Sequence, residues 1–163
     1  MLEAIKNRRS VRDYKADLIS DDDLKEIIKA GQFAPTSMDN RAVEFIVIRD
    51  QKIKQEMFEI VEQDFIIEAP VLLALVTNTD KTTNPVQDLS IASTNIMLQA
   101  ASMSLGTVWK NIRPNPAEAI KTLLNIPPDF MLINLIPIGY PKAKPEPHID
   151  AEFNPKKIHQ DKW

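Results

Sequence analysis

The chain contains no cysteine. Without thiols it cannot form disulfides, hold an iron–sulfur cluster on cysteines, build a cysteine zinc site or use a thiol nucleophile. Histidine is also scarce, because only His148 and His159 occur, and both lie in the C-terminal tail. A serine–histidine triad or a histidine metal site would have to be built there. We therefore predict no metal site and no catalytic side chain, and we expect a bound organic cofactor to carry any chemistry.

Glycine is almost as rare. Gly31, Gly106 and Gly139 lie too far apart for a GxGxxG or Walker loop. The net charge of −3 gives no global indication of a nucleic-acid or anionic-membrane partner. The longest apolar run, Ala69–Val76, is too short to span a bilayer, and the first twelve residues lack the apolar stretch of a secretory signal. These absences favour a cytoplasmic protein with neither nucleic-acid nor membrane partners.

The chain has 163 residues, 44% apolar and 26% charged, which suits one domain over residues 1–163. Leu2 to about Arg9 is predicted to be a short helix with Leu2 and Ile5 facing inward. Ser20 and the three aspartates after it begin a second helix that ends at Ala34-Pro35. Further along, the pattern predicts strands at Phe45–Ile48, Val71–Val76 and Phe130–Ile138, and a short strand at Thr107–Trp109. It also predicts a helix from Gln51 to about Glu62 and a helix start at Asn115–Glu118. Pro137 marks an edge or an end of the last strand.

The segment Asp88–Ser104 is apolar on nearly every side, and its polar residues are mostly small. Such a pattern predicts a helix buried all round. In a chain of this size, a second subunit covering one side makes that burial easier. Gly106 is expected to stop the helix.

The tail, Tyr140–Trp163, is rich in proline and lysine and cannot form a core of its own. It is either disordered or an arm that lies on another surface. The spaced apolar residues Ile149, Phe153 and Ile158, with the terminal Trp163, favour the arm.

The segment Lys6–Arg12 concentrates four cations and a hydroxyl in an otherwise slightly acidic chain. Guanidinium groups bind phosphate through paired, charge-assisted hydrogen bonds, and a serine adds a donor. If the backbone is extended here, Ser10 and Arg12 point the same way. The alternative is a solvated basic helix end that favours the helix dipole.

Two other segments offer polar groups for a site. The loop Ala34–Asn40 carries hydroxyls, an amide and backbone donors after a stiff proline, although by composition it is also an ordinary loop. Trp109, Lys110 and Asn111 follow a strand and would bring an aromatic ring to a site, unless Trp109 simply belongs to the core.

Taken in order, several short segments resemble the nitroreductase family over almost the whole chain. They are RRSVRDY, APTSM, VEFIVI, LQAASMSLGTVWK, IPIGYP and IHQDKW. Each segment alone is weak, but the ordered set is specific, and it is similar to the short members of the family. The resemblance implies an α+β fold, with a central, mostly antiparallel sheet flanked by helices. It also implies an intertwined homodimer in which residues 141–163 pack as an arm on the partner subunit.

The same resemblance implies FMN bound at the subunit interface. By position, the phosphate, ribityl chain and ring edge would be held by Arg8, Arg9, Ser10 and Arg12. The ring would be lined from the other subunit by Pro35, Thr36, Ser37 and Met38. A further segment, Val108, Trp109 and Lys110, would approach the flavin with backbone and side chain.

Some positions depart from the family pattern. After the APTSM segment, Asp39, Arg41, Ala42 and Val43 replace an asparagine and a Gln-Pro-Trp sequence that are frequent in the family. Aspartate near a flavin would disfavour the anionic reduced ring, although Arg41 can pair with it. Where many members have a C-terminal arginine that reaches the phosphate, the nearest match is Glu152. Lys142, Lys144 and His148 are possible substitutes, and none of them is assigned.

The resemblance implies an oxidoreductase in which NADH or NADPH gives a hydride to FMN, which then reduces a small acceptor such as a nitroaromatic or a quinone. One alternative is other flavin chemistry on the same scaffold. The other is a dimeric binding module with a weakened or lost FMN site, of which Asp39 and Glu152 would be symptoms.

Overall fold

The computed structural model describes every residue from Met1 to Trp163. Its sheet has five strands, ordered β1-β2-β5-β3, with β4 also paired to β5, and all neighbours run antiparallel. The strands are β1 (Val43–Ile48), β2 (Val71–Asn78), β3 (Gly106–Thr107), β4 (Lys110–Asn111) and β5 (Phe130–Gly139). The predicted antiparallel sheet is thus confirmed.

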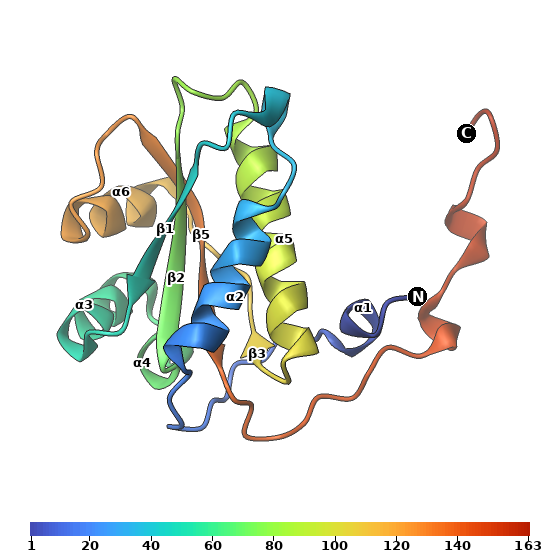
Figure 1. Cartoon of the computed structure of the whole chain (residues 1–163), viewed down its shortest axis with the longest axis horizontal. Coiled ribbons are helices and arrows are strands. Elements are labelled where there is room, and N and C mark those ends of the chain that lie inside the picture. The colour runs from blue at the N-terminus through green and yellow to red at the C-terminus, as the bar shows by residue number, and fades with distance from the viewer.

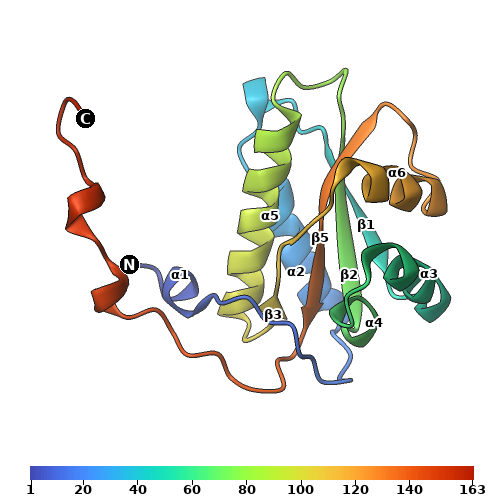
Figure 2. The same ribbon diagram turned by 180° about the vertical axis from the view of Figure 1, so that it is seen from behind.

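Helices cover both faces of this sheet (Figure 1). One face carries α2 (Asp21–Gln32) and α5 (Pro85–Ser102), and the other carries α3 (Gln51–Val61), α4 (Phe65–Glu68) and α6 (Pro114–Leu123). The view from behind in Figure 2 shows the same layers, with the short α1 (Glu3–Asn7) beside the C-terminal end of α5.

The centre of the sheet is apolar on both faces because two separate cores press on it. In β2, Val71, Leu73 and Leu75 belong to the core beneath α2 and α5, whereas Leu72, Ala74 and Val76 belong to the core beneath α3, α4 and α6. Alternate strand residues point to opposite faces, so a strand buried on both faces has a continuous apolar sequence. Such a strand was predicted at this position.

Helix starts agree with the sequence signals in part. The Ser20 hydroxyl accepts from the Asp23 backbone N–H, as expected of a helix cap, and Asp50 caps α3 in the same way. In α6 the predicted start at Asn115-Pro116 is wrong. The helix begins at Pro114, which has no N–H to leave unpaired and therefore also suits the first turn.

Gly106 does not stop α5. The helix ends at Ser102, and the residue in the left-handed region is Ser104, with φ of 61°. Gly106 lies in β3, where a Cβ would come within 2.7 Å of the Val11 side chain. Its glycine is therefore needed for close packing between two segments rather than for a helix end.

Pro137 does not mark an edge, because β5 is paired on both sides. It lies two residues before the end of β5 and faces a gap between two short partners. β3 pairs with Ile138 and Gly139, and β4 pairs with Leu135 and Asn134. Proline, which lacks the ladder donor, is tolerated where a neighbouring strand is interrupted.

Apolar surface remains open on the single chain. Leu2 and Ile5 are exposed, so the prediction that they face inward is wrong for this chain alone. α5 is buried on the side that faces the sheet, but Val86 and Ile91 are exposed on another side. The predicted burial all round is therefore not reached within one subunit.

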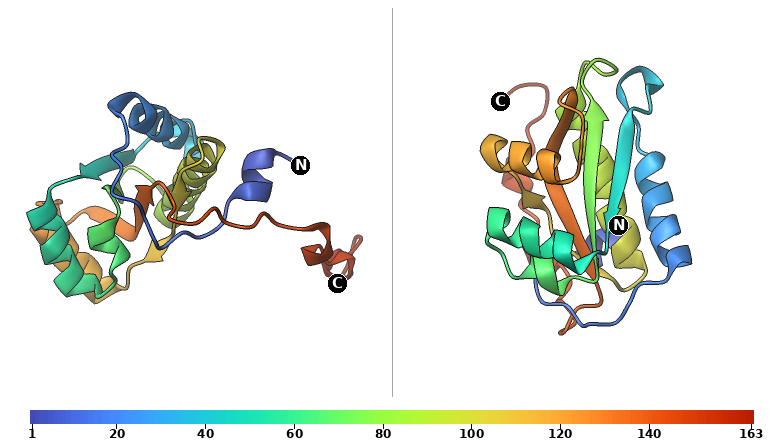
Figure 3. Two further views of the ribbon diagram at one scale, coloured as in Figure 1. Left: turned by 90° about the horizontal axis from the view of Figure 1, so that it is seen from below. Right: turned by 90° about the vertical axis from the view of Figure 1, so that its left-hand side faces the viewer.

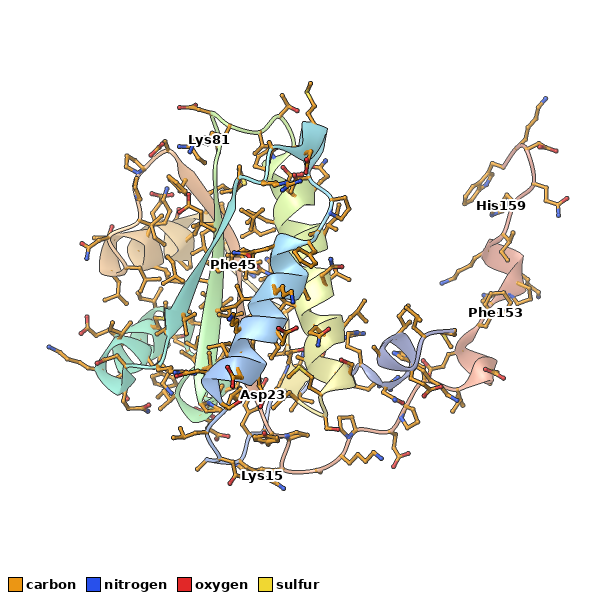
Figure 4. All side chains as sticks on the ribbon, in the orientation of Figure 1. Lys15, Asp23, Phe45, Lys81, Phe153 and His159 are labelled. Atoms are coloured by element: carbon orange, nitrogen blue, oxygen red, sulfur yellow. The ribbon has the colours of Figure 1, made fainter.

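The tail runs away from the body of the molecule (Figure 3). Figure 4 shows Phe153 and His159 far from the sheet and its helices. Residues 149–163 are exposed throughout, and they include the apolar Ile149, Phe153, Ile158 and Trp163. The beginning of the tail lies on its own chain, where the backbone N–H groups of Lys142 and His148 donate to the carbonyls of Asp13 and Lys6. Further along, Glu152 also contacts Arg9.

Candidate functional site

A cavity of about 500 Å³ opens between the N-terminal segment, the end of α5 and the start of the tail. Its lining includes five cationic residues and no carboxylate: Arg8, Arg9, Lys15, Lys142 and Lys144. The lining also includes residues from the end of α5 to β3, among them Ala101, Gly106 and Thr107. In a chain of net charge −3, this concentration of positive charge makes the cavity a candidate site for an anion.

The four residues predicted to hold the phosphate, ribityl chain and ring edge of FMN do not all line the cationic cavity. Arg8 and Arg9 line the cationic cavity. Val11 packs into the core, while Ser10 and Arg12 are exposed and do not line that cavity. Ser10 forms a parallel bridge with Thr107, which confirms that the backbone is extended here.

The Val108–Lys110 segment connects β3 to β4. The side chain of Val108 is 3% exposed within a core, so only its backbone is available to a ligand. Trp109 is half-buried and packs against the core beneath α2 and α5. This position is nearer to that of a core residue, the alternative interpretation of Trp109, than to that of a residue free to contact a ligand. Lys110 lines a different cavity of about 350 Å³, between α3 and the start of α6. One chain therefore does not bring Lys110 to Arg8.

The loop predicted to line the ring lies at the opposite end of α5. Pro35 and Thr36 border a cavity of about 580 Å³, together with Asp39 and Arg41. The backbone N–H of Ser37 donates to Asp88, in the first turn of α5, at 2.8 Å. The cationic cavity includes Ala101, in the last turn of the same helix.

The length of α5 separates these two groups of residues. An 18-residue α-helix is about 27 Å long. Figure 1 shows the loop that follows α2 at one end of α5, and β3 with the N-terminal segment at the other. No single small ligand can contact both ends within one chain. A common site for all the predicted residues therefore requires a second subunit.

Both acidic departures from the family pattern are paired with arginine. Arg41 binds Asp39 through two hydrogen bonds of 2.9 Å, and this pairing lowers the pKa of Asp39. Glu152 lies 3.4 Å from Arg9 and also contacts His148. The hydrogen bond from His148, followed by that from the Ile149 backbone, lowers the pKa of Glu152. Each carboxylate is thus held in its charged form beside a cation.

The donor set fits the phosphate of FMN. Five cations around one cavity match a dianionic group, and a volume of about 500 Å³ lies within the range of small-molecule sites. Nothing in this cavity resembles a metal site, since no three carboxylate, imidazole or thiol groups gather anywhere in the chain. No helix combines the length and apolar character needed to cross a membrane.

Comparison with known proteins agrees with the fold. The model of the Nitroreductase family matches residues 5–63 and 58–140. A relative from Methanothermobacter thermautotrophicus is 34% identical over 169 residues, which cover all of this chain and 87% of the relative. The chain belongs to the nitroreductase family. That relative is provisionally named an NADH dehydrogenase/NAD(P)H nitroreductase.

Two further members extend the comparison. The structure of an FMN-dependent nitroreductase from Clostridium difficile superposes with a TM-score of 0.91 at 28% identity, and all of both chains is covered. An NADPH-dependent oxidoreductase from Staphylococcus aureus is 26% identical over 185 residues, or 97% of this chain and 74% of its own. The nitroreductase fold therefore extends over the whole length of this chain.

The sequence did not indicate two contributors to these sites. Lys15 joins the cationic cavity because the backbone bond from its N–H to the Tyr140 carbonyl brings it beside the tail. Asp88 anchors the loop after α2, yet its partner Ser37 lies 51 residues earlier. Acidic residues are common in the first turn of helices, so nothing local distinguished Asp88.

Proposed function

We propose that this chain forms a homodimeric, FMN-dependent oxidoreductase, which uses NADH or NADPH to reduce small acceptors such as nitroaromatics and quinones. Membership of the nitroreductase family supports the class of reaction. The names of similar proteins, an FMN-dependent nitroreductase and an NADPH-dependent oxidoreductase, support the cofactor and the donor. The observation that carries the proposal is the cationic cavity, because its five cations support the binding of a flavin phosphate there.

The chain's own residues would bind and orient the cofactor rather than react. Arg8 and Arg9 would hold the phosphate, with Lys15, Lys142 and Lys144 adding positive charge. Ser10 and Arg12 are exposed in the same segment but outside that cavity, so they would be available to the ribityl chain and the ring edge. A cation at the ring edge would stabilise negative charge on the reduced ring. When bound, FMN supplies the hydride chemistry, which this chain's side chains lack.

The second subunit would supply the ring-side loop. This loop lies beside the first turn of α5, whereas the cationic cavity of the same chain lies at the last turn. The loop residues Pro35, Thr36, Ser37 and Met38 are therefore too distant to reach that cavity. The exposed apolar residues of α5 and of the tail support a dimer, because large apolar side chains left in water favour a protein partner. Residues 141–163 would form the arm that packs on that partner.

The test is the visible spectrum of the purified protein before and after addition of FMN, followed by anaerobic titration with NADH and with NADPH. A flavin band that one donor bleaches, and that an acceptor restores, is the expected result. A bound flavin that neither donor reduces would contradict the oxidoreductase and favour other flavin chemistry. Protein that stays colourless after reconstitution would contradict flavin binding altogether. The contact of Glu152 with Arg9 would then favour the module with a lost FMN site.

A further inference from the structure

Asp88 is a buried carboxylate without a cationic partner. Its side chain, in the first turn of α5, belongs to a residue that is 2% exposed, and no lysine or arginine forms an ion pair with it. It accepts instead from three neutral donors. They are the backbone N–H of Ser37 at 2.8 Å, the side-chain amide of Asn40 at 3.2 Å and the hydroxyl of Thr82 at 2.6 Å.

Two of these donors lie at either end of one short loop segment. Ser37 and Asn40 flank Met38 and Asp39, so the carboxylate of Asp88 binds the loop at both ends of its tip. Thr82 comes from the segment before α5, and its hydroxyl donates to Oδ2 of Asp88, the same oxygen that accepts from Asn40. No other side chain forms hydrogen bonds to both Ser37 and Asn40.

The bound segment has a conformation that it would not keep unaided. Met38, Asp39 and Arg41 all lie in the left-handed region, with φ of 52°, 53° and 50°. Residues with a Cβ adopt this region rarely, and they persist there only where the surroundings fix them. Met38 is also 95% exposed, so its own packing does not hold it in place. The hydrogen bonds to Asp88 are therefore a principal restraint on the shape of the loop.

Charge makes these bonds stronger than neutral ones. Burial alone would raise the pKa of Asp88, but the hydrogen bonds from Thr82, Ser37 and Asn40 outweigh it and hold the pKa below its ordinary value. Asp88 is therefore ionised at neutral pH. An ionised carboxylate accepts from all three donors at once, whereas an amide in its place would turn an N–H₂ group toward at least one of them.

We propose that Asp88 is a positioning residue for the flavin site: its carboxylate fixes the loop Thr36–Arg41, which forms the ring-side wall of the site on the partner subunit. This inference rests on the proposed function and adds that the positioning acts in trans. Asp88 touches neither cofactor nor substrate. A change at Asp88 of one chain therefore alters the ring environment of the flavin whose phosphate is held by the Arg8 of the other chain.

The first test is Asp88→Asn, which keeps the shape and removes the charge. We expect the variant to remain dimeric and to retain FMN, with a shifted visible absorption and circular dichroism of the flavin. Because small displacements of a reacting geometry are costly, kcat/KM for the acceptor should fall on the order of ten- to a hundredfold. The matched control is Asp22→Asn, which removes an exposed acid from the first turn of α2 and leaves the loop untouched. An Asp88→Asn enzyme with the kinetics and flavin spectrum of the control would overturn the inference.

A second variant keeps the proposal testable if Asp88→Asn does not fold. Thr82→Val removes one donor to the carboxylate and leaves the loop sequence intact. It should shift the flavin spectrum in the same direction, by less. An unchanged spectrum and an unchanged KM for the acceptor in that variant would contradict the role of Asp88.

Mixed dimers distinguish positioning in trans from a general effect on folding. One chain carries Asp88→Asn with its cationic segment intact, and the other carries Arg8→Ala and Arg12→Ala with its loop intact. Positioning in trans leaves one site per mixed dimer with both parts unaltered, so half of the sites should regain the wild-type KM and flavin spectrum. If Asp88 acts within its own chain, both sites are defective and nothing is regained. A wild-type protein that binds no FMN would contradict the proposed function itself, before any variant is compared.

Discussion

The carboxylate of Glu152 lies 3.4 Å from the guanidinium of Arg9, joining the tail to the end of α1. His148 contacts both groups, 2.8 Å from Arg9 through its Nδ1. Arg9 also lines the cationic cavity, so a phosphate bound there would compete with Glu152 for the same cation. The tail thus brings an acid to the place where the family resemblance implies a cation.

Glu152→Gln should tighten FMN binding, because it frees Arg9 from a competing charge. Both partners are more than a third exposed, and exposed ion pairs are weak, so the dissociation constant should fall only about two- to fivefold. Fluorescence titration of the apoprotein with FMN measures this. Glu146→Gln is the control, since Glu146 lies in the same tail and forms no ion pair. Equal affinities in the two variants would show that Glu152 does not compete with the phosphate.

Arg8→Ala combined with Arg12→Ala should release FMN while the dimer persists. Arginine is well matched to phosphate, and no other residue of the extended segment replaces two guanidinium groups. Flavin content per subunit after gel filtration measures the effect, and light scattering reports the dimer. Lys25→Ala with Lys52→Ala removes the same charge from exposed positions on α2 and α3. Unchanged flavin content in the arginine variant would refute the assignment of this segment to FMN.

The apolar residues of the tail should be required for dimerisation. Ile149 and Phe153 are largely exposed on the single chain, and replacing both with serine removes apolar area that a partner would bury. We expect the dimer to be weaker and to dissociate at a higher protein concentration than the wild type, as measured by light scattering over a concentration series. Lys156→Ser with Lys157→Ser changes the same tail without removing apolar anchors. Identical dissociation of the two variants would exclude the tail from the interface.

Substitutions at Gly106 and Ser104 should change the stability of the folded chain in opposite directions. Gly106→Ala places a Cβ within 2.7 Å of Val11, and overpacking of this kind costs about 1–3 kcal/mol. Ser104→Gly relieves a left-handed backbone and should stabilise by about 1 kcal/mol. Thermal unfolding measures both changes. Adding Val11→Ala to Gly106→Ala should recover part of the loss, and no recovery would show that the contact with Val11 is not its cause.

The contribution of Asp88 to stability should disappear in acid. Its pKa in the folded protein lies below the ordinary 3.8, so the charged form is favoured by folding. Such a group stabilises above the ordinary value, and the contribution is lost as pH falls through the lower, folded value. The difference in unfolding free energy between wild type and Asp88→Asn should therefore be constant near neutrality and shrink below about pH 4. Urea unfolding at a series of pH values measures it. A difference that grows in acid would contradict the direction of the shift.

Most of the fold could be predicted from the sequence because its signals are local. The cap at Ser20, the continuous apolar run of β2 and the position of β5 all depend on residues near one another. Two of the errors occurred where a distant segment decides. Gly106 is fixed by Val11, nearly a hundred residues earlier in the chain, and Pro137 is tolerated because β3 and β4 leave a gap beside it. A local sequence pattern shows neither the contact of Gly106 with Val11 nor the gap beside Pro137.

The site was predicted less completely, for a related reason. The basic composition of Lys6–Arg12 is visible in the sequence, but which side each residue faces depends on Val11 entering the core. Lys15 enters the cavity only through its backbone bond to Tyr140, and Asp88 reaches the loop only because α2 packs beside α5. The residues alone indicated that a partner could cover α5 and that the tail is an arm, but that a second subunit completes the flavin site came only from the family resemblance.

The length of α5 has a consequence for how the protein behaves on dilution. If each flavin is held by the cationic end of one chain and the loop end of another, a lone subunit offers only half of the contacts. Cofactor affinity and subunit affinity are then thermodynamically linked: FMN shifts the monomer–dimer equilibrium toward the dimer, and dilution releases both together. The fraction of protein that is yellow would depend on total protein concentration as well as on FMN. Two preparations of identical chains could therefore differ in specific activity solely because they were assayed at different concentrations.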